Sequence, residues 1–121
     1  NLKSIIKNSD AILIDRGDLS RYVNYEKIPI AQEVIIKEGI KRKKDVYVAT
    51  NLLESMINNF FPSRAESHDI YNTLNQGAKG LVLAAETAIG NNPLEVVKYI
   101  KKSIKVFKNK KKYKRNVINF M

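Results

Sequence analysis

The chain has 121 residues, of which 44% are hydrophobic, and a formal net charge of +10; this length and composition are typical of one domain with a core of its own. It contains no cysteine, which excludes disulfides, thiol catalysis and cysteine-ligated metal sites. No apolar run approaches the roughly 20 residues that span a membrane, and the first residues lack the apolar core of a secretory signal, so we expect a soluble cytoplasmic protein without a membrane partner.

One pattern is repeated three times along the chain. Residues 2–8 have the pattern of the end of an amphipathic helix, so we expect the chain to be part of a longer polypeptide. Short apolar runs then recur about 35 residues apart, the spacing of a strand followed by a crossover helix. These runs predict three buried strands, at residues 11–14, 46–49 and 81–84.

A helical pattern follows each predicted strand. The first runs from residue 27 to about residue 43 with one apolar and one charged face. The second is expected at residues 66–76, with Gly77 as its stop. The third carries a start signal made of a capping residue, a proline for the first helical position and an acidic residue for a capping box: Asn92, Pro93 and Glu95.

Three consecutive βα units predict an α/β fold with parallel strands joined by right-handed crossovers. A closed (βα)8 barrel needs eight such units and about 250 residues, so the chain would carry fewer than half of one. An open sheet covered by helices fits the same pattern. In the barrel case the outer strands would have unpaired edges, which favour association with another segment or subunit.

The polar positions of the units lie where the predicted strands end. They are residues 15–20, then Thr50 with Asn51, and then residues 84–90. The carboxyl ends of parallel strands meet at one edge, where α/β proteins bind their ligands. Carboxylates suit a hard cation, and backbone N–H groups at a helix start suit an anion. The pattern therefore predicts one site, for a divalent cation and an anionic substrate.

Four motifs make this expectation more specific. They read RGDLS at residues 16–20, ATNLLESM at 49–56, PSRAE at 62–66 and ETAIGNNPLEVV at 86–97. In this order the chain resembles the pyruvate kinase family, whose patterns are ARGDLG, ATQMLESM, PTRAE and SGETA-x-G-x-x-P-x-E-A-V. The resemblance covers residues 1–107 and implies that the units are the last three of a TIM (βα)8 barrel, incomplete as an isolated chain, with the active site at the strand ends.

The resemblance also implies roles for four residues. Asp18 would be a ligand of Mg²⁺ or Mn²⁺, and the backbone N–H groups of Gly17 and Asp18 would hold the carboxylate of phosphoenolpyruvate. Thr50 would bind the same substrate near the carbon that accepts a proton, and Glu86 would belong to the polar network beneath it, so these two are the candidate catalytic residues. The family transfers a phosphoryl group from phosphoenolpyruvate to ADP, giving pyruvate and ATP, with a divalent metal and usually K⁺. A homo-oligomer is expected.

Each of these positions also fits a simpler role. Asp18 could cap the next helix, and Thr50 could bond to backbone at the strand end. Ser63 and Glu66 satisfy a capping box, which favours a structural role for the PSRAE motif. The two phenylalanines at residues 60 and 61 are expected to anchor a loop to the barrel.

Substitutions at the strand ends bear on activity. Ser20 stands where the family pattern has its second glycine, a position that can require a positive φ. Ala84 and Ala85 replace Ser-Gly, which removes a hydroxyl from the region of proton delivery. No residue can be assigned to the family's phosphate-binding lysine, second acidic metal ligand or K⁺ site, so we expect the isolated chain to be inactive. A non-catalytic relative with a binding or assembly role is the alternative.

The positive charge lies at the C-terminal end. All twelve acidic residues lie at or before Glu95, together with twelve of the 22 basic residues, so the whole excess lies beyond it. We divide the chain into a partial barrel domain at residues 1–107 and a basic tail at residues 108–121. Anionic-partner binding through the tail is a minor alternative. Nucleic-acid binding is disfavoured, because the lysines of the last predicted helix would lie on its solvated face.

Overall fold

The computed structural model describes residues 1–120 and has an α/β fold with one parallel sheet. Its elements in chain order are α1 (Leu2–Lys7), β1 (Ala11–Asp15), α2 (Arg16–Leu19), η1 (Tyr25–Lys27), α3 (Ile28–Lys41), β2 (Asp45–Ala49), η2 (Glu54–Ile57), α4 (Arg64–Gln76), β3 (Gly80–Val82), α5 (Ala85–Ala88), α6 (Pro93–Lys108) and α7 (Lys110–Phe120), where η marks a 3₁₀ helix.

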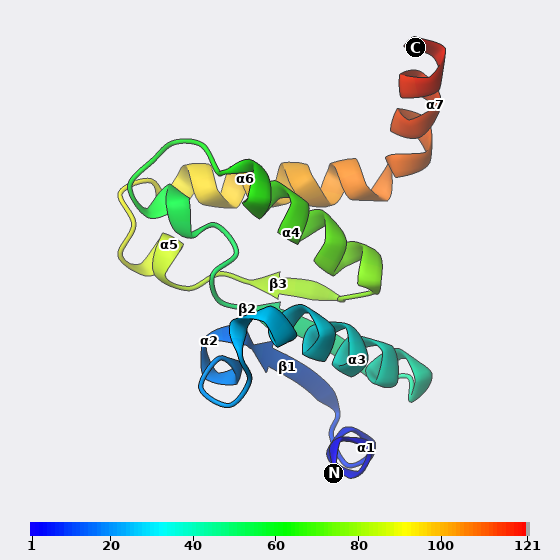
Figure 1. The fold of residues 1–121 in the computed structure, drawn as a ribbon. Coiled ribbons are helices and arrows are strands. Elements are labelled where there is room, and N and C mark those ends of the chain that lie inside the picture. Colours follow the sequence, from blue (N-terminus) through cyan, green and yellow to red (C-terminus); the bar gives the residue numbers. More distant parts are fainter. Residues whose placement is uncertain (121) are drawn as a thin grey trace.

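The sheet has three parallel strands in the order β1-β2-β3, as the spacing of the apolar runs predicts (Figure 1). β1 pairs with β2 along its whole length, whereas β3 ends at Val82 and does not reach residue 84 as expected. The reason lies in β2. The chain turns at Thr50, where φ is 73°, so β2 offers β3 no partner beyond Ala49.

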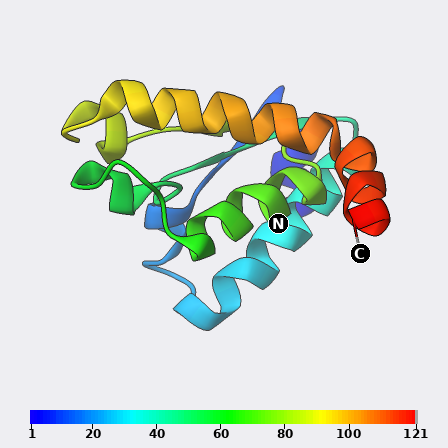
Figure 2. The same cartoon turned by 90° about the horizontal axis from the view of Figure 1, so that it is seen from above.

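Helices cover one face of the sheet. α3, α4 and α6 lie side by side in that order (Figures 1 and 2). Ile14, Val46 and Val48 point to this covered face and are buried. On the opposite face Leu13 and Val82 are 58% and 40% exposed. One face covered by helices and one open face are what a segment of a barrel wall presents.

A second apolar cluster joins α4 and α6 to the loop after β2. Leu52, Leu53 and Met56 of that loop are at most 1% exposed and pack with residues of both helices. The expectation that residues 60 and 61 anchor this loop is wrong, because Phe60 and Phe61 are 62% and 81% exposed. The buried side chains come from η2 and the residues before it, which leaves the phenylalanines at the surface.

Two of the three predicted helix signals are present in the structure. Ser63 and Glu66 form the capping box of α4, with both reciprocal hydrogen bonds. Gly77 ends α4 with a φ of 115°. The predicted capping box at Asn92 is wrong, because no side-chain bond caps α6; Glu95 lies 3.5 Å from Lys98 instead, one turn further along the helix.

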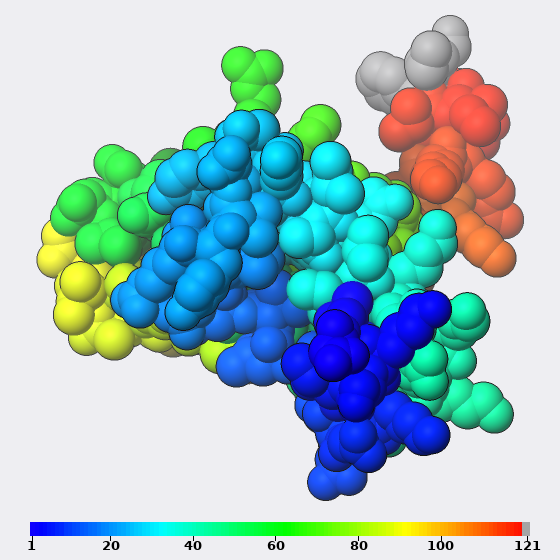
Figure 3. Space-filling view, turned by 60° about the horizontal axis from the view of Figure 1, so that its bottom comes forward, coloured from blue at the N-terminus to red at the C-terminus, as the bar shows by residue number. Residues whose placement is uncertain are grey.

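The first and last helices project from the body of the molecule (Figure 3, dark blue and orange to red). The predicted boundary between residues 107 and 108 falls at the end of α6, and most of the basic tail is helix α7. Within the described residues, no helix combines the length and apolarity needed to cross a bilayer.

Candidate functional site

The register of the sheet aligns the ends of the three strands. Asp15 pairs with Ala49, and Ala49 pairs with Val82. The residues that follow each strand therefore leave the sheet at one level, as expected for a ligand-binding edge. We call this edge the rim: residues 15–20 after β1, Thr50 and Asn51 after β2, and residues 83–86 after β3.

Thr50 occupies the middle of the rim in an unusual backbone conformation. Its φ is 73° and that of Asn51 is 58°. A left-handed conformation is disfavoured for a β-branched residue and costs of order 1–3 kcal/mol, which is typical of functional positions. The Thr50 hydroxyl accepts a hydrogen bond from the Gly17 N–H at 2.8 Å and lies 2.7 Å from the Ala49 carbonyl oxygen. The structure thus joins Thr50 directly to the turn after β1.

The two backbone donors assigned to a substrate carboxylate already have partners. The Gly17 N–H donates to Thr50 Oγ1, and the Asp18 N–H donates to Asp15 Oδ1 at 3.1 Å. Asp15 is therefore the side chain that caps α2, and the Asp18 side chain is 67% exposed. A carboxylate that binds here would have to replace these internal acceptors.

Glu86 lies on the rim after β3 but faces inward. It is 1% exposed, and its carboxylate accepts the Ala84 N–H at 2.9 Å, two residues earlier. None of its hydrogen bonds in the described residues reaches Thr50 or Asp18. Its assignment as a catalytic residue stays a prediction, as do those of Gly17, Asp18 and Thr50.

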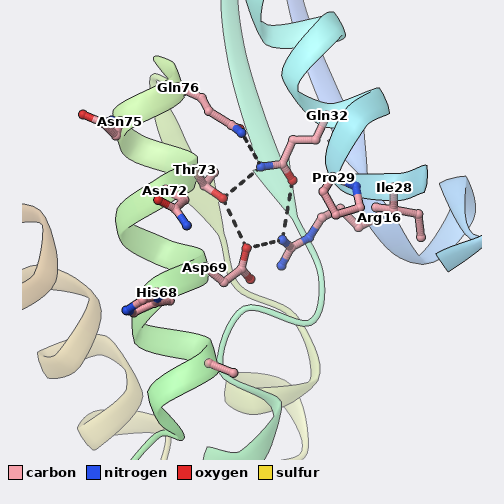
Figure 4. A pocket seen from close by; sticks show the side chains of 11 residues that line it. Arg16, Ile28, Pro29, Gln32, His68, Asp69, Asn72, Thr73, Asn75 and Gln76 are labelled. Carbon is pink, nitrogen blue, oxygen red and sulfur yellow. Dashed lines mark hydrogen bonds and ion pairs between the residues drawn. The ribbon is translucent and has the colours of Figure 1, made fainter. Parts of the chain in front are cut away.

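Arg16 is the polar residue of the rim that the motifs did not single out. Its side chain is 11% exposed. Nε and Nη2 donate to the Thr50 carbonyl oxygen at 3.1 and 2.9 Å, and Nη1 donates to Asp69 Oδ1 at 2.7 Å (Figure 4). These partners lie 34 and 53 residues away in the sequence, so no local pattern could reveal them; the only signal was an arginine at a strand end.

The Arg16 network continues between α3 and α4. Arg16 Nη1 lies 3.5 Å from Gln32 Oε1, and Gln32 Nε2 donates to Thr73 and Gln76 at 3.0 Å each. Gln32 is 5% exposed and Thr73 is fully buried. These side chains line a cavity of about 490 Å³ with both helices (Figure 4). The network fixes the two helices and the rim in one arrangement.

Glu66 joins the loop after β2 to the start of α4. Its carboxylate accepts the Ser55 N–H at 2.8 Å, the Ser55 hydroxyl, and the Ser63 N–H at 2.8 Å. Burial raises the pKa of the Glu66 carboxyl, but the hydrogen bonds from Ser55 and Ser63 outweigh it, so the net pKa lies below its ordinary value. These contacts agree with a structural role for the PSRAE motif.

The substitutions at the rim have visible consequences. Ser20 has a φ of −64°, so this position needs no glycine, and its hydroxyl donates to the Gly17 carbonyl oxygen at 2.6 Å. Ala84 precedes α5, and no side chain caps that helix. A serine at this position would add a hydroxyl beside Glu86.

The acidic residues of the rim fit one ligand of a divalent cation. Asp18 is exposed, and its nearest cationic partner, Arg21, is 4.0 Å away. Asp15 Oδ1 already accepts the Asp18 N–H. Within residues 1–120, no group of three or more His, Cys, Asp or Glu side chains could hold an ion. Mg²⁺ requires octahedral coordination by oxygen, so Asp18 suits an ion whose other ligands come from another segment.

Comparison with known proteins gives a consistent result. The family model described as pyruvate kinase, barrel domain, matches residues 1–97. The pyruvate kinase of Thermotoga maritima is 47% identical over 116 residues, which are 96% of this chain and 25% of that protein. The pyruvate kinase of Methanocaldococcus jannaschii is 42% identical over 106 residues, which are 88% of this chain and 24% of that protein.

Solved structures agree with these matches. The crystal structure of pyruvate kinase from Pyrobaculum aerophilum superposes with a TM-score of 0.83 at 36% identity, covering 85% of this chain and 23% of the other. The chain thus spans about a quarter of the length of the relatives that it matches. Another relative, 46% identical over 98 residues (81% of this chain and 23% of that protein), is an isozyme of Ricinus communis described as chloroplastic, so the cytoplasmic location stays a prediction from the sequence.

Proposed function

The chain belongs to the pyruvate kinase family, and we propose that it supplies the last three units of a pyruvate kinase barrel, with Thr50 and the start of α2 as the binding site for the substrate carboxylate. The complete protein would transfer a phosphoryl group from phosphoenolpyruvate to ADP, giving pyruvate and ATP. The observation that carries this proposal is the hydrogen bond between the Gly17 N–H and the hydroxyl of Thr50, which keeps its left-handed backbone.

In this proposal the rim binds phosphoenolpyruvate by exchanging partners. The substrate carboxylate accepts the N–H groups of Gly17 and Asp18 at the start of α2, where the positive end of the helix favours an anion. The Thr50 hydroxyl, released from the Gly17 N–H, then donates to the substrate. Asp18 would hold Mg²⁺ or Mn²⁺, which neutralises charge on the transferred group when bound. Glu86, beneath the rim, would support the region where the enolate is protonated.

The remaining partners are proposed on the same basis. K⁺, the second acidic metal ligand and the phosphate-binding lysine would be held by other parts of the complete protein, as would the nucleotide. We also propose a homo-oligomer for the complete protein. The 121-residue chain alone is expected to lack activity, because none of these groups can be assigned within it.

The proposal is tested with a chimera in which residues 1–97 replace the matching segment of the Thermotoga maritima enzyme. We expect phosphoenolpyruvate-dependent ATP synthesis from this chimera and a loss of at least about 100-fold from its Asp18→Asn variant, because one metal ligand is removed. The exposed Asp10→Asn serves as the matched control. A chimera that folds, as judged by circular dichroism, yet makes no ATP would contradict the proposal.

A non-catalytic role is the second candidate, favoured by Ala84 in place of serine and by the internal partners of the Gly17 and Asp18 N–H groups. It predicts that the folded chimera stays inactive both as it is and as Ala84→Ser. The first proposal predicts activity before the substitution and an equal or higher kcat after it.

A further inference from the structure

Arg16 makes its closest contacts with backbone of the neighbouring strand end. Two of its donors, Nε and Nη2, converge on one acceptor, the Thr50 carbonyl oxygen, at 3.1 and 2.9 Å. The side chain is 11% exposed, so water does not compete strongly for these bonds. Charge-assisted hydrogen bonds from a planar guanidinium fix both the position and the direction of an acceptor.

Thr50 is the residue of the rim that most needs such a restraint. A β-branched side chain disfavours its φ of 73°. The direction of the Thr50 carbonyl depends on the same backbone turn that sets the direction of its side chain. Arg16 holds the carbonyl, and the next residue, Gly17, donates its N–H to the hydroxyl at 2.8 Å. Two adjacent residues after β1 thus restrain both polar groups of Thr50.

The guanidinium is itself held from the far side. Nη1 donates to Asp69 Oδ1 at 2.7 Å, and Gln32 Oε1 lies 3.5 Å away. Asp69 comes from α4 and Gln32 from α3, so both helices behind the sheet contribute to the direction of the Arg16 fork (Figure 4).

We propose that Arg16 is a positioning residue, which holds Thr50 in its left-handed conformation and so directs its hydroxyl toward the substrate, with Asp69 orienting the guanidinium. The inference rests on the proposed function of Thr50. It goes beyond that function in assigning a role to a residue that does not touch the substrate. Lysine cannot replace Arg16, because a single ammonium lacks the fork that engages the carbonyl with two donors while reaching Asp69 with a third.

A double-mutant cycle in the chimera defined above tests this role. We expect Arg16→Lys to lower kcat by about 10-fold to 100-fold, since a displacement near 1 Å can cost about that much. KM for ADP should stay unchanged. The Thr50→Val variant removes the hydroxyl, so adding Arg16→Lys to it should cost no more than about twofold, because Arg16 then has nothing left to position. Arg42→Lys, which alters an arginine paired with Glu38 on α3, is the matched control and should leave kcat unchanged.

Two results would overturn the role of Arg16. One is a loss from Arg16→Lys that multiplies with that of Thr50→Val, since a general destabilisation acts independently of the hydroxyl. The other is a crystal structure of the Arg16→Lys chimera in which Thr50 keeps its positive φ and its bond to the Gly17 N–H. The crystal structure needs no activity, so an inactive chimera, which contradicts the proposed function, leaves this second measurement decisive. We expect it to show Thr50 displaced and the bond lost.

Discussion

At the scale of single residues, the charged groups of this chain divide between structure and the proposed chemistry. Glu66 lies in one of the motifs that identify the family, yet its carboxylate is fully used by Ser55 and Ser63. Asp18 carries a carboxylate that is largely exposed. The difference lies in the partners. An acid whose bonds are all made within the chain stabilises the fold, whereas an exposed one at a strand end is free to bind an ion.

Glu66 gives a prediction about the dependence of stability on pH. Its folded-state pKa lies below the ordinary value, so the carboxylate stabilises the fold above that value, and this contribution is lost as the pH falls through the lowered pKa. Glu66→Gln should lower the free energy of unfolding by about 1 kcal/mol at neutral pH, because one acceptor becomes a donor facing an N–H group. It should also flatten the decline of the melting temperature below about pH 5.

The measurement for Glu66 is thermal unfolding followed by circular dichroism from pH 7 to about pH 3. Glu54→Gln, at an exposed position in η2, is the control and should behave as the unaltered chain does. A Glu66→Gln variant with the same pH dependence as the unaltered chain would refute the assignment of that dependence to Glu66.

At the scale of elements, local backbone conformation decides where strands and helices end. Thr50 ends β2 with a positive φ and thereby limits β3, and Gly77 ends α4 at a φ of 115°. A Cβ at Gly77 would overlap the Cδ1 atom of Ile40, so this turn also sets how closely α4 approaches α3. The short link from α4 to β3 depends on this approach.

Replacing Gly77 with alanine should therefore destabilise the chain. A residue with a side chain is strained at this φ by about 1–3 kcal/mol, and the contact with Ile40 adds to that cost. Chemical denaturation should give a lower midpoint with an unchanged slope. Lys79→Ala, at an exposed position two residues later, is the control. A Gly77→Ala variant as stable as this control would show that the turn tolerates a side chain.

The sequence predicts this level of structure well wherever the signal is local. The apolar runs predict all three strands, because a strand buried on its covered face needs such a run, and the residues of two helix ends, Gly77 and Ser63, are correctly predicted. The end of β3 depends on the partner strand, and the Arg16 network joins residues up to 53 positions apart. Asn92 has the right residue type for a cap but not the conformation. These features arise from tertiary contacts, which local patterns do not contain.

At the scale of the whole molecule, the sheet has one open face and two open edges. Leu13 and Val82 lie exposed on that face, and β1 and β3 each have only one neighbouring strand in the described residues. A groove of about 380 Å³, lined by residues such as Ile12, Leu13 and Tyr22, runs along the edge of β1. Exposed strand edges beside apolar surface promote association.

We therefore expect the isolated 121-residue chain to self-associate in a concentration-dependent way, as measured by sedimentation velocity. Leu13→Lys, on the open face, should shift the chain toward monomer without lowering its melting temperature, because this side chain is 58% exposed. Tyr22→Lys, in an exposed loop at the same edge, separates the effect of the face from that of added charge. A chain that stays monomeric at all concentrations would contradict this expectation.

The basic tail makes a separate contribution. Residues 108–121 carry six basic residues and no acidic one: Lys108, Lys110, Lys111, Lys112, Lys114 and Arg115. A truncation after Phe107 should lower the salt concentration that elutes the chain from an anionic column, since fewer cations contact the matrix. It should leave the melting temperature unchanged, because residues 111–119 are exposed. Activity of the chimera built from residues 1–97 would show that the tail is not needed for catalysis.

The role of the Thr50 hydroxyl tests the central claim most directly. In the chimera we compare kcat/KM for phosphoenolpyruvate between the unaltered sequence, Thr50→Ser and Thr50→Val. Serine keeps the hydroxyl and should stay within about tenfold of threonine, whereas valine keeps the shape and should lose about 100-fold to 10,000-fold, the contribution of a positioned proton-transfer group. A Thr50→Val chimera with the same kcat/KM as the unaltered one would contradict the claim that this strand end binds the substrate.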